Sequence, residues 1–125
     1  MADISVKHEV LRRAGRIRFR KFTKGGYDQF KIRLSLSGPL SQIEYVEYEL
    51  HPTFRDPVQI SKDQSAGFPI EFWTWGEFEI FVTARFLDGH DEELTYYLKY
   101  SSELPPEHAA YYDETPESIW EVKDE

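Results

Sequence analysis

The amino-acid sequence predicts an all-β protein, a β-sandwich of about seven or eight antiparallel strands. Three observations lead to this fold class. Apolar and polar residues alternate along several short segments, which gives each predicted strand one buried and one solvated face. Clusters of turn residues separate these segments. No segment repeats its apolar residues at helical spacing over three turns.

The expected strands are weak at the N-terminus and clearer further along the chain. In order they cover residues 4–10, 17–22, 30–36, 46–50, 68–72, 78–86 and 94–100. The breaks "TKGGYD", "SGPLSQ" and "LDGHDE" lie between them. The Asp-Gly pair in the last of these breaks suits the positive backbone torsions of a tight hairpin.

The C-terminal segment lacks alternation, and we expect it to lie outside the sandwich. The domain is expected to cover residues 1–104, followed by an acidic tail over residues 105–125 in which Pro105 and Pro106 stop any strand. We expect this tail to be mobile, or to begin a short helix with Thr115 as its cap. It could also dock on the domain or on a partner through three rings, Tyr111, Tyr112 and Trp120.

Composition excludes several classes of function. The chain of 125 residues has no Cys, and its four His are scattered, so we expect no metal, no cofactor and no thiol nucleophile. It also lacks a Ser-centred elbow and a phosphate loop, and we expect no enzyme. No apolar run is long enough for a membrane span, and the N-terminus does not resemble a secretory signal, so we expect a cytoplasmic protein.

Charge is distributed unevenly. Residues 1–33 hold ten Lys and Arg against three acids, whereas the remainder holds five against twenty. Arg16, Arg18 and Arg20 fall on one face of a predicted strand. This row could bind phosphates, form a solvated strand face, or contact the acidic tail. The acidic excess of the remainder makes nucleic acid an unlikely partner.

Two spaced motifs carry a resemblance to a known family. "VEYELHPTFRDPV", then "WTWGEFEIFVTARFLDG" and "LTYYLKY", resemble a YEATS domain, and short sequences with this pattern are similar to the prokaryotic branch of that family. The match runs from Val46 to about Tyr100. The resemblance implies an immunoglobulin-like sandwich and a non-catalytic module that reads acylated lysine.

The resemblance also implies a set of ligand-binding residues. Phe54 and Trp75 would form the two aromatic walls of a slot, with the Thr53 hydroxyl and the His51 imidazole beside the acyl amide. Backbone N–H groups near Trp75 and Gly76 would bond the acyl carbonyl. Trp73 is a further candidate, although it could instead cover the sheet edge. Thr74 stands where the family usually has Gly.

The physical chemistry of such a slot favours a neutral, flat amide. Stacked rings and a few hydrogen bonds supply the affinity. A free lysine ammonium would lose its hydration and, we expect, meet no carboxylate between the rings. The partner would be a modified peptide or a partner protein.

Simpler interpretations remain open for the same residues. Phe54 could plug the end of the sandwich, and Thr53 could bond its own loop. The alternative function is a protein–protein adaptor of a bacterial signalling or defence system without a ligand slot. It would use the tail or the outer sheet face that carries Phe81, Arg85 and Tyr97.

Overall fold

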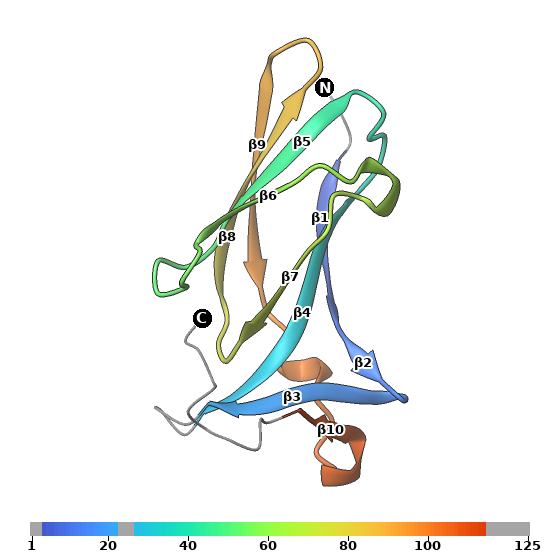
Figure 1. The fold of residues 1–125 in the computed structure, drawn as a ribbon, viewed down its shortest axis with the longest axis vertical. Coiled ribbons are helices and arrows are strands. Elements are labelled where there is room, and N and C mark those ends of the chain that lie inside the picture. Colours follow the sequence, from blue (N-terminus) through green and yellow to red (C-terminus); the bar gives the residue numbers. More distant parts are fainter. Residues whose placement is uncertain (1–3, 23–26, 115–125) are drawn as a thin grey trace.

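The computed structural model describes residues 4–22 and 27–114, and these residues form two packed β-sheets (Figure 1). The strands are β1 (Ser5–Val10), β2 (Arg12–Arg13), β3 (Arg16–Phe22), β4 (Tyr27–Ser37), β5 (Ile43–Glu49), β6 (Val58–Ser61), β7 (Ile70–Thr74), β8 (Phe78–Phe86), β9 (Asp91–Leu98) and β10 (Tyr111–Asp113). The short 3-10 helices are η1 (Gln64–Ala66), η2 (Ser101–Glu103) and η3 (His108–Ala110). The all-β prediction is therefore confirmed.

One sheet has four strands in the order β6-β5-β8-β9, all antiparallel. The other has six strands, in which β1, β4, β3 and β10 follow one another, while β2 pairs with β3 and β7 pairs with β4. Within the described residues, no helix is long and apolar enough to cross a membrane.

The core lies between the two sheets. It is formed by every second side chain of each strand, because successive side chains point to opposite faces of a sheet. Along β8 the buried residues Ile80, Val82, Ala84 and Phe86 alternate with residues that face outward. In β4, Ile32, Leu34 and Leu36 are buried in the same manner from the other sheet. A hydrogen bond from Tyr48 Oη to the Phe68 carbonyl (2.6 Å) satisfies the one polar atom of a fully buried ring. Burial raises the pKa of Tyr48 far above its ordinary value.

A polar contact also joins the two sheets at their edge. His8 of β1 bonds through Nδ1 to the Tyr96 hydroxyl of β9, and its Nε2 lies 2.7 Å from Glu103 Oε2 of η2. The imidazole therefore connects an edge strand of each sheet to the segment that follows β9.

The first part of the expected tail packs on the sandwich, as in the docked alternative considered for Tyr111. β10 pairs with β3, and it does so in parallel, whereas we expected antiparallel strands alone. Tyr111 packs edge-on against Phe19, with ring centroids 5.7 Å apart, and its hydroxyl bonds the Pro105 carbonyl at 2.5 Å. Trp120 and the helix expected after Thr115 lie outside the described residues.

The sequence missed β2, β6 and β10 as strands. β6 alternates, but its large apolar residues, Val58 and Ile60, are the exposed ones. β10 is only three residues long and follows two prolines. Segments this short give little periodic signal, and only pairing with a longer strand makes them regular.

Candidate ligand-binding site

Two connections converge on a cavity at one end of the sandwich. One follows β5 and covers residues 50–57, and the other, residues 75–77, precedes β8. β5 and β8 are antiparallel neighbours, so the end of one strand lies beside the start of the other. The cavity between these connections has a volume of about 250 Å³. Its lining residues are His51, Thr53, Phe54, Thr74, Trp75, Gly76, Glu77 and Phe78.

The two aromatic residues expected as walls both line this cavity, in different environments. Phe54 is partly buried and packs against Phe72 (centroids 5.5 Å apart, rings at 85°) and Phe78 (5.3 Å). Trp75 is 52% exposed. Phe54 therefore both closes the end of the core and presents a fixed apolar wall, while Trp75 presents its ring to solvent at the other wall.

His51 and Thr53 form a small hydrogen-bonded unit. His51 Nδ1 accepts the Thr53 backbone N–H at 3.2 Å and lies 2.8 Å from Thr53 Oγ1. Because Nδ1 accepts this N–H, the neutral ring carries its proton on Nε2, and the Thr53 hydroxyl donates to Nδ1. The lone pairs of Thr53 Oγ1 can then accept an N–H group from a ligand.

Thr74, where the family usually has Gly, supports the turn beneath Trp75. Its side chain is buried, and Oγ1 accepts the Gly76 N–H at 3.4 Å and lies 3.3 Å from the Gly76 carbonyl oxygen. The hydroxyl thus fixes the turn from below, as Thr does in short turns. A Cβ added at Gly76 would meet no atom within 4 Å, so this residue borders open space.

Glu77 is a lining residue of the cavity whose carboxylate binds the segment after β9. Its Oε2 accepts the backbone N–H groups of Ser101 (2.8 Å) and Tyr100 (2.9 Å). These hydrogen bonds lower the pKa of Glu77 below its ordinary value, and the bond from Ser101 has the largest effect. Partial desolvation of the carboxylate opposes this shift. The group is therefore ionised at neutral pH, and one of its oxygens is already engaged.

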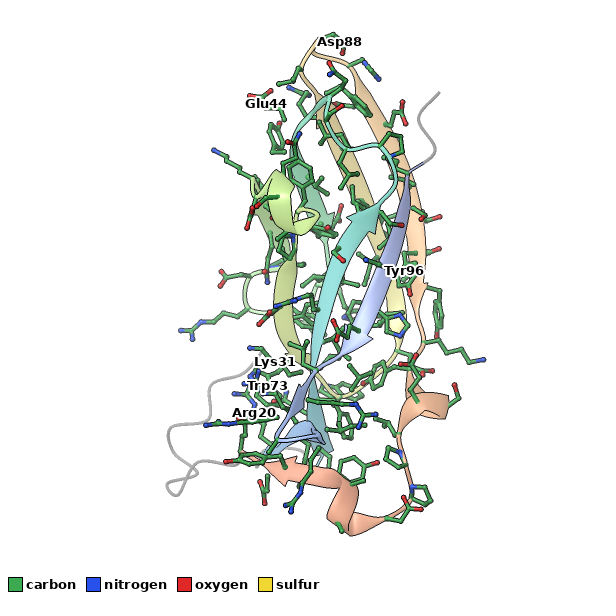
Figure 2. The ribbon with its side chains drawn as sticks, turned by 90° about the vertical axis from the view of Figure 1, so that its right-hand side faces the viewer. Arg20, Lys31, Glu44, Trp73, Asp88 and Tyr96 are labelled. Atoms are coloured by element: carbon green, nitrogen blue, oxygen red, sulfur yellow. The ribbon has the colours of Figure 1, made fainter. Side chains whose placement is uncertain are left out.

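Trp73 lies elsewhere. Its half-buried ring is approached by three cations: Arg20 at 4.6 Å, Lys31 at 5.2 Å and Arg18 at 5.8 Å. Figure 2 shows Trp73 beside Arg20 and Lys31. Successive side chains of β7 point to opposite faces, so the buried Thr74 lines the cavity while Trp73 covers the outer side of the six-stranded sheet.

The row of Arg16, Arg18 and Arg20 contacts other parts of the chain. Arg18 Nε bonds Glu114 Oε1 at 2.9 Å, which is the contact with the acidic segment that we considered, and Arg13 joins the same carboxylate at 2.8 Å. Arg20 Nε bonds Gln29 Oε1 at 2.7 Å. Arg16 is exposed at the start of β3.

Sequence reasoning missed Thr74, Glu77 and Phe78 as lining residues. All three flank the expected Trp75–Gly76 turn, so proximity in sequence was the available signal. Among the described residues, no group of three or more His, Asp or Glu could hold a metal ion.

Comparisons with known proteins place this geometry in a family. A model of the prokaryotic YEATS domain matches residues 30–99, more than half of the chain. No match was found among curated protein sequences.

Solved structures share the fold at low identity. The Yaf9 YEATS domain recognising an H3K122suc peptide has a TM-score of 0.58 and 17% identity, covering 81% of this chain and 72% of that chain. The yeast AF-9 homologue Yaf9 has a TM-score of 0.55 and 17% identity, and the match covers 82% of this chain and 66% of that chain. The Yaf9 YEATS domain bound to H3K27ac has a TM-score of 0.52 and 16% identity, and the match covers 87% of this chain and 79% of that chain. Like those domains, this protein is an immunoglobulin-like sandwich, and it belongs to the prokaryotic YEATS domain family.

Proposed function

We propose that this protein is a non-catalytic binding module that takes an acylated lysine, or a similar flat uncharged group, in the cavity between Phe54 and Trp75. The observation that carries the proposal is the convergence of His51, Thr53, Phe54, Trp75 and Gly76 on one cavity. Its volume of about 250 Å³ is below the ~300–1,000 Å³ of pockets for drug-sized ligands, which suits a single acyl amide.

Each wall has a role in this proposal. Phe54 and Trp75 contact the two faces of the planar acyl amide. Thr53 Oγ1, whose proton is directed to His51, accepts the amide N–H. The backbone N–H groups of the turn at Trp75 and Gly76 would be the donors for the acyl carbonyl, and the Gly76 N–H would then be shared with Thr74 Oγ1, to which it donates at 3.4 Å. The Yaf9 structures with H3K122suc and H3K27ac peptides support a modified peptide as the class of partner.

Glu77 refines the expected selectivity. A succinyl group would bring a second negative charge close to the ionised Glu77, a lining residue, so neutral acetyl and crotonyl groups should bind more tightly. A free lysine ammonium would lose its hydration, and Glu77 compensates it only in part because Oε2 accepts two N–H groups.

A calorimetric titration tests the proposal with one short peptide carrying acetyl-, crotonyl-, succinyl- or unmodified lysine. We expect the neutral acyl peptides to bind best. Trp75→Ala should weaken that binding about tenfold or more, because a stacked ring contributes ~0.5–1.5 kcal/mol beyond its buried area. Trp73→Ala is the matched control, since it removes a Trp from the adjoining strand outside the cavity.

Two results would contradict the proposal. One is equal binding of all four peptides. The other is an affinity for acetyllysine that Trp75→Ala leaves unchanged while circular dichroism shows both variants folded.

A further inference from the structure

The outer face of the four-stranded sheet exposes large apolar side chains. Val58 (50% exposed), Ile60 (53%), Phe81 (48%) and Tyr97 (57%) all lie on its strands. The described residues contain six large exposed hydrophobic side chains, and these are four of them. Contiguous apolar surface on a sheet that faces solvent is typical of an interaction site.

The strand register makes these side chains neighbours. Glu49 lies between Val58 of β6 and Phe81 of β8. Glu47, two residues earlier on β5, lies between Ile60 and Thr83. Tyr97 lies opposite Glu79, two residues before Phe81. Directly opposite residues are about 5 Å apart, so the four apolar side chains and the acids between them form one surface. We call it the β6–β9 face.

The β6–β9 face also contains a depression of about 430 Å³. Phe81 forms an apolar wall, and Thr83 and Thr95 line it with hydroxyls. Glu49 and Glu93 bring carboxylates to the same depression from β5 and β9. Its lining therefore combines an aromatic surface with two negative charges.

Four acids of this face have side chains without an internal partner. In the part of the chain that the structure describes, the side chains of Glu47, Glu49, Glu79 and Glu93 form no hydrogen bond or ion pair. By contrast, Glu71 and Glu114 bond Arg side chains on the other sheet. On the same face, Arg85 is bonded to Asp91. The four Glu carboxylates are therefore available to a cation from a partner.

We propose that the β6–β9 face docks a second protein through a segment in which Lys or Arg side chains flank apolar ones. The apolar anchors would cover Val58, Ile60 and Phe81. The stem of a basic side chain would lie along Phe81, with its cation between Glu49 and Glu93. Charge complementarity favours such a partner and disfavours nucleic acid and anionic membranes.

A second copy of this chain is a poorer occupant. The outer side of the six-stranded sheet carries cations, but several are already engaged: Arg33 with Glu71, Arg18 with Glu114 and Arg20 with Gln29. Docking that surface on the β6–β9 face would break internal ion pairs to form new ones. A basic segment of another protein could bind the β6–β9 face without breaking ion pairs within this chain.

A display library of random 12-residue peptides, selected on the immobilised full chain, tests this inference without assuming a partner. We expect enriched peptides that place Lys or Arg beside apolar residues. Their affinity should fall at least tenfold for Phe81→Ser and for the double variant Glu49→Lys/Glu93→Lys. The matched control Glu9→Lys/Glu107→Lys makes the same charge change at exposed positions, one on β1 of the other sheet and one after η2, and should bind like wild type.

The outcomes are separable from those of the ligand-slot proposal. Trp75→Ala should leave selected peptides bound, whereas Phe81→Ser should leave acetyllysine binding unchanged. The inference is overturned if enriched peptides are acidic, if none is enriched, or if their binding survives both face variants. It is also overturned if sedimentation shows a dimer that Phe81→Ser dissociates, because a second copy would then cover the face.

Discussion

A residue in the connection before β7 fixes how closely this connection approaches β4. Gly67 has a φ of +80°, and a Cβ added there would lie 2.9 Å from the Leu36 carbonyl oxygen. Its own carbonyl accepts the Leu36 N–H at 2.8 Å, so the backbones of two segments touch directly. Glycine is required both for the torsion and for the close approach. Gly76, in the turn that lines the cavity, satisfies neither condition.

These two glycines give a matched prediction. Gly67→Ala should lower the free energy of unfolding by at least ~1–3 kcal/mol, because a left-handed backbone is strained for alanine and the new methyl group meets backbone. Gly76→Ala should change it by less than ~1 kcal/mol. Urea denaturation followed by circular dichroism measures both. Equal losses for the two variants would show that the contact at Gly67 has been misjudged.

At the scale of an element, the β8–β9 hairpin carries a titratable group at its tip. Asp88 Oδ1 accepts the His90 backbone N–H at 3.0 Å and also contacts His90 Nδ1. The His90 ring stacks on Phe86, with centroids 4.4 Å apart and planes at 11°. The hydrogen bond from the imidazolium to Asp88 is the largest cause that raises the pKa of His90 above 6.5.

The sign of the resulting pH dependence follows from linkage. A folded-state pKa above the unfolded value means that the protonated ring stabilises the hairpin below about pH 6.5. This contribution is lost as the pH rises through the folded-state pKa. An NMR titration should therefore give His90 a pKa above 6.5, and Asp88→Asn should lower it. A His90 pKa at or below 6.5 in the wild type would contradict the contact.

At the scale of the whole molecule, the sandwich depends on a strand far from its partners in sequence. β10 lies beside β3 in Figure 1, and Tyr111 contacts Phe19 and Phe30, with ring centroids 5.7 and 6.2 Å away. Glu114 adds bonds from Arg13 and Arg18. Burial raises the pKa of Glu114, but the two Arg side chains lower it more, so its pKa is below the ordinary value. The segment 105–114 therefore packs as part of the fold.

A truncation tests this conclusion. A chain that ends at residue 104 should be less stable than one that ends at residue 114 by at least ~1.5–3 kcal/mol, the contribution of burying one large apolar side chain. Thermal unfolding of the two chains makes the comparison. Identical unfolding curves would mean that β10 contributes nothing to stability, and the boundary first expected at residue 104 would stand.

Features that depend on a local pattern of residues could be predicted from the amino-acid order. Alternation in 30–36 and 78–86 was sufficient to predict two-faced strands and the sandwich, because the side-chain period of a strand is visible in the sequence. The motif around His51 and Trp75 resembled a family, and that resemblance predicted that the two segments lie at one end of the sandwich, where both line the same cavity. Alternation also placed Phe81, Arg85 and Tyr97 on one outer sheet face, and the structure has these residues on β8 and β9 of the four-stranded sheet.

Only the tertiary structure decided which groups share a space. Trp73 and Trp75 are two residues apart, yet one covers an arginine-rich sheet face and the other lines the cavity, since β7 ends between them. The Glu77 carboxylate is held by the backbone N–H groups of Tyr100 and Ser101, more than twenty residues later. β10 is a strand because β3 is beside it. Contacts between distant segments have no local signal, so no reading of residue order alone could predict them.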